Sequence, residues 1–353
     1  MRSSERVLAL SRALQISGRI AERLGHARCV DELGPIGEQL WEDHQTNAAV
    51  ESSLLNVLSR VLDAAVVSKR ELVLLKFAAL RTAGIVRPGS RVAQDLDLLV
   101  AEEQARPLWQ ELLGVGFRRF GASRYEHQLE SLVDASDAVV ELHVHVPGIA
   151  GPPRRFATTT EVMSDPDAKR IARGEGAFWL PSHAFLAAHA ISHGLLQNRS
   201  APQAYSPLRM LGDLIDLRVS SRCVAESARW LNRAADDQEL AAIERLCALL
   251  ERGDLPRTSS SPEAVLLAHC LAARLDERYA ETLRGAAFAY ELSEHSRPRA
   301  MLAKLWRSLA PSDAELDALY GPAHSELSRF GQRIRRPFDV AGRAARRWLR
   351  RRQ

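Results

Sequence analysis

The sequence is poor in cysteine. Its 353 residues include only four, Cys29, Cys223, Cys247 and Cys270, and no two of them form a CxxC pair. Zinc ribbons need such closely spaced thiols, so the sequence excludes that class of metal site. The wide spacing also argues against a disulfide framework and predicts a reducing, cytoplasmic location.

Long hydrophobic runs are absent as well. No uninterrupted apolar stretch approaches the roughly 18 to 20 residues that a transmembrane helix needs, so an integral membrane protein is not expected. The first twenty residues contain Glu5 and four arginines, the last at position 19, which disagrees with a secretion signal. The composition is 46% hydrophobic and 26% charged, which is ordinary for a globular protein and excludes a disordered or fibrous chain.

Positive charge is concentrated at one end of the chain. Residues 329–353 carry ten arginines against one acid, a local balance of +9 against +4 for the whole chain, which leaves −5 for the other 328 residues. Apolar residues such as Phe338, Trp348 and Leu349 stand among these arginines. The tail is compatible with a basic amphipathic helix that contacts anionic lipid or RNA, with a solvated terminus as the alternative.

The order of the apolar patterns predicts an α+β fold with one small sheet and flanking helices. Apolar residues recur at helical spacing near the N-terminus and again over most of residues 181–320, whereas the segment between them mixes helices and short strands. The expected helices in that segment are 70–83 and 102–114, and the expected strands are 94–100, 117–120, 125–132 and 138–146. Residues 148–180 are expected to be irregular. The predicted parts are an N-terminal helical segment at 1–66, a core at 67–180, a helical domain at 181–328 and a basic tail at 329–353.

Two acids stand inside an apolar strand, in the run QDLDLLV. Asp95 and Asp97 are two residues apart, so on a strand they project from one face while Leu96 and Leu98 face the core. Adjacent carboxylates at the edge of a hydrophobic layer repel each other and lose hydration, and a divalent cation relieves both costs. The pair therefore predicts a Mg²⁺ site, with a solvated acidic strand end as the alternative.

A second strand supplies a third acid. In residues 139–146 (VVELHVHV) the apolar side chains form one face, and Glu141, His143 and His145 form the other. If the two strands are neighbours with their polar faces matched, three carboxylates converge. Such a set can hold one or two Mg²⁺ ions that bridge nucleotide phosphates and an attacking hydroxyl. The same alternation is also expected of an ordinary half-exposed strand.

These segments resemble a known protein family. The shared features are an LLK segment ending at Lys76, an R-x3-D-x-D-L-L-V strand that starts at Arg91, and an acid-Leu-His strand at Glu141. They are similar to the uncharacterised bacterial nucleotidyltransferase family of the polymerase-β-like nucleotidyltransferase superfamily over roughly residues 70–147. A later helical region with histidines and a Leu-x-Asp-Leu segment is also similar; here it contains His189, His193 and Asp213.

The resemblance implies an enzyme that transfers a nucleoside monophosphate from a nucleoside triphosphate to a hydroxyl acceptor and releases pyrophosphate. Asp95 and Asp97 would hold Mg²⁺, for which Mn²⁺ can substitute, and Glu141 would be the third carboxylate, which can activate the incoming hydroxyl. Residues 67–180 would be the catalytic core. Catalysis of this kind rests on positioning and charge neutralisation. The nucleotide and the acceptor stay open.

The turn that would hold the triphosphate departs from the pattern of the superfamily. Its members have a Gly-Ser or Gly-Gly turn, whereas Phe77 follows Lys76 here. Lys76 and Arg91 are the expected phosphate ligands in its place, Arg91 through a bidentate fork. A turn at Gly89 and Ser90 is the alternative. His143 is also expected to contact the nucleotide.

His189 and His193 are four residues apart and so share one face of a helix. Together with Asp213 they are predicted to line the acceptor pocket, with packed core histidines and a zinc site as alternatives. Two other functions stay open for the whole chain. One is a binding or scaffold protein that keeps the fold without the chemistry, and the other is a nucleic-acid-binding protein that acts through the basic tail.

Overall fold

The computed structural model describes residues 3–120, 127–146, 157–197, 206–217, 221–231, 237–275, 316 and 325–335. Contacts within the chain divide it into two compact units, Met1–Glu277 and Arg278–Gln353. The predicted sheet, its flanking helices and all candidate site residues belong to the first unit. The finer boundaries expected after residues 66, 180 and 328 remain predictions.

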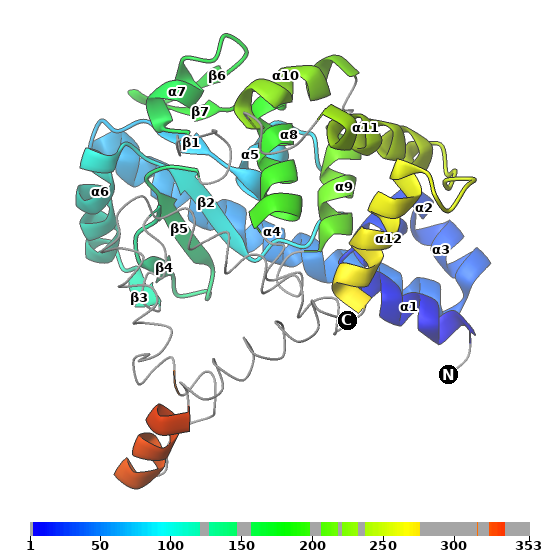
Figure 1. The fold of residues 1–353 in the computed structure, drawn as a ribbon. Coiled ribbons are helices and arrows are strands. Elements are labelled where there is room, and N and C mark those ends of the chain that lie inside the picture. The colour runs from blue at the N-terminus through cyan, green and yellow to red at the C-terminus, as the bar shows by residue number, and fades with distance from the viewer. Residues whose placement is uncertain are drawn as a thin grey trace. The chain divides into compact units, whose positions relative to one another are not determined.

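A mixed sheet forms the centre of the first unit (Figure 1). Within the described residues it has seven strands, in the order β3-β4-β5-β2-β1-β7-β6. The central strand β2 pairs in parallel with β5 and antiparallel with β1, and β1 pairs in parallel with β7. The strands are β1 (Leu72–Leu74), β2 (Asp95–Leu99), β3 (Arg118–Phe120), β4 (Ser131–Val133), β5 (Val139–His143), β6 (Lys169–Arg173) and β7 (Gly176–Leu180). The predicted α+β class is confirmed.

Helices cover the sheet and continue beyond it. The long helix α4 contacts α6, β2 and β7, and it runs behind the sheet in Figure 1. Its apolar side chains join those of β1, β2 and β5 in the main hydrophobic core. The helices are α1 (Ser3–Ala13), α2 (Ser17–Leu24), α3 (His26–Leu33), α4 (Pro35–Val67), α5 (Lys76–Thr82), α6 (Glu102–Gly114), α7 (Thr159–Met163), α8 (His183–Ile191), the π-helical turn η1 (Ser192–Gln197), α9 (Pro207–Asp216), α10 (Ser221–Leu231), α11 (Asp237–Glu251) and α12 (Pro262–Leu275).

The helix predicted for residues 70–83 is wrong in its first half, which is strand β1 followed by the short helix α5. Leu72 and Leu74 pack into the main core, whereas Val73 and Leu75 pack into a second core on the opposite side of the sheet. A strand that is buried on both faces has no polar alternation, so its apolar run cannot be told from a buried helix by periodicity.

The irregular segment predicted for residues 148–180 is also wrong over its described part. Residues 159–180 form helix α7 and the hairpin of β6 and β7. The first residues of α7 are held by a capping box between Thr158 and Glu161, and Gly174 adopts φ +54° in the hairpin turn. The strand expected at 125–132 is also shorter than predicted, since β4 begins at Ser131.

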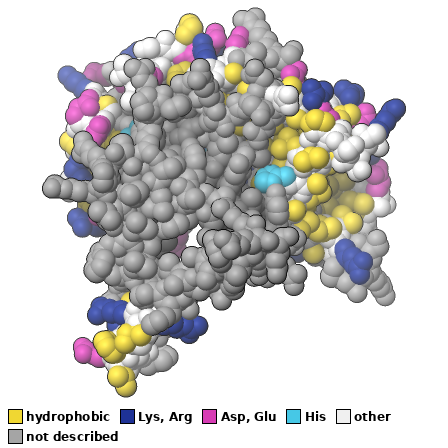
Figure 2. All heavy atoms as spheres, viewed as in Figure 1, with side chains coloured by type: hydrophobic (Ala, Val, Ile, Leu, Met, Phe, Trp, Pro, Cys, Tyr) yellow, Lys and Arg dark blue, Asp and Glu magenta, His cyan; other side chains and the backbone are white. Residues whose placement is uncertain are grey.

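In the second unit, residues 326–335 form a helix with apolar and basic side chains on its surface (Figure 2). Leu327, Phe330 and Ile334 are 80%, 59% and 49% exposed. Their spacing places them along one side of the helix. The remainder of the predicted basic tail, residues 336–353, lies outside the described residues.

Candidate active site

The two acid-bearing strands are neighbours in the sheet. β2 and β5 run in parallel, and their register places Asp97 opposite Glu141 and Leu99 opposite His143. Leu96, Leu98 and Leu142 point into the main core. Because successive side chains of a strand alternate between its faces, the acids project from the other face. The structure therefore brings together the two polar strand faces that the sequence pattern pointed to.

Asp97, Glu141 and His143 form a compact group at this position. One ligand atom from each lies within 4.8 Å of the other two. His143 Nε2 is 2.9 Å from Asp97 Oδ1 and 3.7 Å from Glu141 Oε2, and the hydroxyl of Ser131 donates a 3.2 Å hydrogen bond to Glu141 Oε1. Two carboxylates and an imidazole are a donor set that could hold a divalent metal ion. Asp95, half-buried on the same strand face, is outside this group of three.

The three acids differ in the direction in which their pKa values are shifted. Burial opposes the ionisation of Asp97, but the charge of Lys76 and the hydrogen bond with His143 outweigh it and hold the pKa of Asp97 well below its ordinary value. Burial and the negative charge of Asp97 raise the pKa of Asp95 and of Glu141. One ionised carboxylate is thus flanked by two acids that give up their protons less readily.

Lys76 is the cation that compensates Asp97. Its Nζ donates a 2.5 Å hydrogen bond to Asp97 Oδ1, and the Lys76 side chain is only 17% exposed. Lys76 is the first residue of α5 and adopts φ +41°, a left-handed conformation that non-glycine residues seldom take. The turn from β1 into α5, where the superfamily pattern has glycine, is therefore made by the lysine itself.

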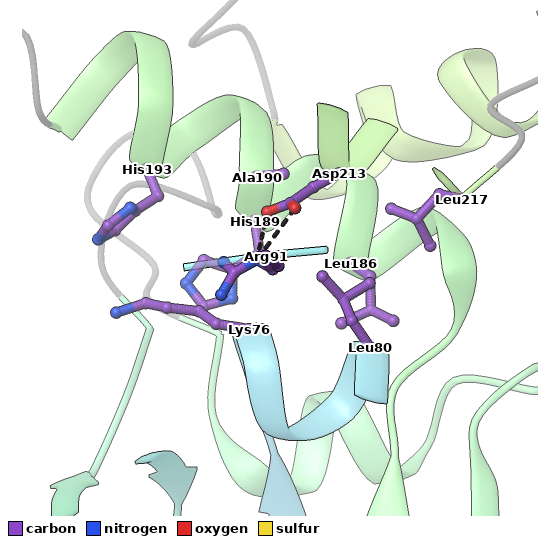
Figure 3. A pocket seen from close by; sticks show the side chains of 9 residues that line it. All are labelled: Lys76, Leu80, Arg91, Leu186, His189, Ala190, His193, Asp213 and Leu217. Atoms are coloured by element: carbon purple, nitrogen blue, oxygen red, sulfur yellow. Dashed lines mark hydrogen bonds and ion pairs between the residues drawn. The ribbon is translucent and has the colours of Figure 1, made fainter. Parts of the chain in front are cut away.

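A pocket adjoins Lys76 on the side of α8 and α9 (Figure 3). In Figure 3 the side chains of Lys76 and His193 extend in the same direction. Burial, and then the charge of Lys76, lower the pKa of His189 to about 3 and place that of His193 well below its ordinary value, so both imidazoles are neutral at pH 7. The pocket is lined by Lys76, Leu80, Arg91, Leu186, His189, Ala190, His193, Asp213 and Leu217. The three residues predicted for an acceptor pocket thus share one cavity with Lys76 and Arg91.

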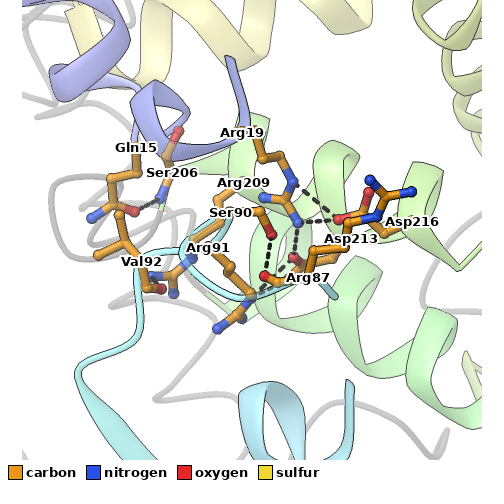
Figure 4. Close-up of polar contacts among 10 residues, drawn as sticks. All are labelled: Gln15, Arg19, Arg87, Ser90, Arg91, Val92, Ser206, Arg209, Asp213 and Asp216. Carbon is orange, nitrogen blue, oxygen red and sulfur yellow. Dashed lines mark hydrogen bonds and ion pairs between the residues drawn. The ribbon is translucent and has the colours of Figure 1, made fainter. Parts of the chain in front are cut away.

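Asp213 is also the centre of a buried charge network (Figure 4). Arg91 Nε donates to both carboxylate oxygens of Asp213, at 3.0 and 3.1 Å, and Arg19 donates to it at 2.6 Å. Arg19 also pairs with Asp216 at 2.7 Å. Burial raises the pKa of Asp213, but the charges of Arg91 and Arg19 outweigh that effect and lower it. The network connects α2 and α9 to the segment that leads into β2.

Most of the chain matches a known protein family. Residues 2–252 match the family described as "Uncharacterised nucleotidyltransferase". The chain belongs to this nucleotidyltransferase family. The resemblance noted in residues 70–147 is confirmed, and the match extends over α1 to α11. Comparisons with curated proteins and with solved structures gave no match.

In this nucleotidyltransferase, the polar groups of Gly89 and Ser90 already form hydrogen bonds within the protein. The backbone N–H of Gly89 donates to Glu51 on α4, and the hydroxyl of Ser90 donates to the carbonyl of Arg87. Gly89 adopts φ +73°, which favours glycine. These contacts anchor the loop to α4, so both groups would have to exchange partners in order to bind phosphate.

Sequence reasoning missed two residues beside the site. The ring of His127 stacks on that of His143 at 5.6 Å, and burial followed by the charges of His143 and His145 lowers the pKa of His127 to about 2. His127 lies outside the named strands, next to the isolated bridge between Gln128 and His143, and no local pattern encodes that pairing. Arg19 is 194 residues from its partner Asp213, and no local signal identifies it.

None of the helices in the described part of the nucleotidyltransferase combines the length and the apolar character that crossing a membrane requires.

Proposed function

We propose that this nucleotidyltransferase moves a nucleoside monophosphate from a nucleoside triphosphate to a hydroxyl acceptor, depends on a divalent metal ion and releases pyrophosphate. One observation carries the proposal. Asp97 is 1% exposed, and its Oδ2 atom has no hydrogen-bond partner among the described residues, although it belongs to the group with Glu141 and His143. A buried carboxylate oxygen is costly unless something binds it, and a cation fits this donor set.

Asp97 and Glu141 are the residues that would hold the ion, and Asp95, on the same strand face, is proposed as a further ligand. When bound, the ion would neutralise charge on the phosphates and polarise the phosphorus–oxygen bonds. The strand pairing fixes the positions of Asp97 and Glu141 before any ligand arrives. Such preorganisation lowers the cost of assembling a highly charged site.

Glu141 is proposed as the group that takes the proton from the acceptor hydroxyl. Its pKa is raised by burial and by the charges of Asp97 and Asp95, which makes its carboxylate a better base than an exposed glutamate. The hydrogen bond from Ser131 holds one of its oxygens. The Glu141→Gln variant should therefore lose turnover to a greater extent than it loses nucleotide affinity.

Lys76 and Arg91 are proposed as the ligands of the triphosphate. Both line the pocket beside the acids. The ammonium group of Lys76 now pairs with Asp97, and it can pair with a phosphate oxygen instead once a metal ion neutralises the acids. His189, His193 and Asp213 line the same pocket and are proposed to shape the acceptor site. His143 contacts Asp97, and it is proposed to contact the nucleotide that is held beside the acids.

A second candidate function is a binding or scaffold protein without the chemistry. The ion pair between Lys76 and Asp97 favours it, because an internal lysine already neutralises the ionised acid of the site. The two functions differ in their dependence on metal. A scaffold would bind its nucleotide equally well in the presence of a chelator.

The test is calorimetric titration of the wild-type protein with ATP, GTP, CTP and UTP, each with a divalent ion and with a chelator. We expect at least one triphosphate to bind only with the ion, and we expect Asp97→Asn to abolish that binding. Asp31→Asn is the matched control, because Asp31 is an exposed residue of α3. Metal-independent binding, or unchanged binding by Asp97→Asn, would contradict the proposal.

A further inference from the structure

The identity of the metal ion is encoded in the donor atoms of the site. From the sequence, three carboxylates were expected, and an all-oxygen set suits Mg²⁺. The structure instead groups two carboxylates with the imidazole of His143, while Asp95 lies outside that group of three. The compact group thus contains a nitrogen donor that the expected all-oxygen set lacks.

We infer that the site selects a first-row transition-metal dication such as Mn²⁺ over Mg²⁺, with His143 Nε2 as a direct ligand. Imidazole nitrogen binds such ions well, whereas Mg²⁺ prefers oxygen and gives up its waters reluctantly. The inference rests on the proposed function, because the ion concerned is the one that would hold the nucleotide phosphates.

The burial of Asp97 and His143 supports a direct contact between the imidazole and the ion. Asp97 is 1% exposed and His143 5% exposed, so little water can mediate between them. His143 Nε2 already lies near an oxygen of each carboxylate, at 2.9 Å from Asp97 and 3.7 Å from Glu141. The ring is held in place by the stack with His127. A ligand atom fixed in this way loses little conformational freedom when it binds an ion.

Metal binding would change which ring nitrogen of His143 carries the hydrogen. An ionised carboxylate only accepts hydrogen bonds, so Nε2 donates to Asp97 Oδ1 in the metal-free site. To ligate an ion through Nε2, the imidazole would need the other tautomer, with its hydrogen on Nδ1. The ammonium of Lys76 would then have to release Asp97 Oδ1.

A simpler alternative is that His143 only orients Asp97 through its hydrogen bond. The His143→Gln variant separates the two roles, since a glutamine amide can donate to Asp97 but cannot ligate as an imidazole does. His26→Gln is the matched control, because His26 is an exposed residue at the start of α3. Circular dichroism and thermal melting check that each variant is folded.

Mn²⁺ binding to the nucleotide-free protein is followed through the electron paramagnetic resonance signal of the free ion, with Mg²⁺ as competitor. We expect the wild type and His26→Gln to bind Mn²⁺ about tenfold or more tightly than Mg²⁺, and His143→Gln to lose most of this preference. Pulsed spectra of bound Mn²⁺ should show coupling to a ¹⁴N nucleus in the wild type and none in His143→Gln.

An absent ¹⁴N coupling in the wild type, or an unchanged preference in His143→Gln, overturns the inference. These measurements contain no nucleotide, so they succeed or fail independently of the transfer reaction. Selective Mn²⁺ binding without any nucleotidyl transfer would refute the proposed function alone. Transfer supported by Mg²⁺ without nitrogen ligation would refute the metal assignment alone.

Discussion

Among single side chains, Lys76 and Asp97 form a buried ion pair with a large expected effect on stability. Both partners are largely buried, at 17% and 1% exposure of the side chain. Breaking a buried pair leaves an uncompensated charge in a medium that solvates it poorly. We expect Lys76→Met to lower the free energy of unfolding by about 3 kcal/mol at pH 7, measured by urea denaturation.

The double variant Lys76→Met/Asp97→Asn provides the control for this prediction. Removing both charges leaves neither partner unpaired, so its loss of stability should be clearly smaller than the sum of the two single losses. Additive losses would show that the two side chains do not interact in solution.

His189 is expected to make stability depend on pH. Its pKa is about 3 in the folded chain, against about 6.5 in an unfolded chain. The unfolded state therefore binds the extra proton between these values, and stability falls as the pH drops below about 6.5. The charged and titratable groups that act on His189 are Lys76, Arg91, Asp97, His143 and His193.

Between pH 7 and pH 5 this single residue should cost about 2 kcal/mol of stability. We expect His189→Gln to remove that part of the pH dependence, as measured by urea denaturation at the two pH values. If the wild type and the variant lose equal stability on acidification, His189 is not buried in its neutral form.

Between elements, the network around Asp213 links α2 to α9 and to the segment before β2. Asp213→Asn would leave Arg19 and Arg91 buried beside a neutral amide, so we expect a loss of about 3 kcal/mol or more. Asp216→Asn is the control, because Asp216 is 21% exposed and its loss should cost about 1 kcal/mol or less. If chemical denaturation shows that both variants lose the same free energy of unfolding, Asp213 is not the main partner of the two arginines.

Elements with one buried and one polar face could be predicted from the sequence. The strands that carry Asp97 and Glu141, and the helix at 102–114, show the expected periodicity. β1 could not be predicted because both of its faces are buried, and β6 is too exposed and polar to give an apolar signal. Alternation predicted that Glu141 and His143 share one strand face, whereas the approach of Asp97 to both depends on a register between β2 and β5 that only the folded sheet defines.

At the scale of the whole molecule, the basic tail is predicted to bind an anionic surface. The helix at 326–335 exposes Leu327, Phe330 and Ile334 beside Arg329 and Arg333, a pattern that suits an anionic surface. We expect removal of residues 331–353 to weaken binding to anionic liposomes or RNA, with a loss that shrinks as salt is raised. Identical binding by the full and truncated chains at every salt concentration would rule out a role for the tail.

The central claim is that Asp97 on β2 and Glu141 on β5 support nucleotidyl transfer. Its most direct test is to incubate the protein and cell extract with each nucleoside triphosphate, labelled in separate reactions at the α- or the γ-phosphate. We expect an acceptor to become labelled from the α-position only. Asp97→Asn and Glu141→Gln should abolish the labelling, and Asp31→Asn should retain it. Equal labelling by wild type and Asp97→Asn, or no labelling from any of the four nucleotides, would contradict it.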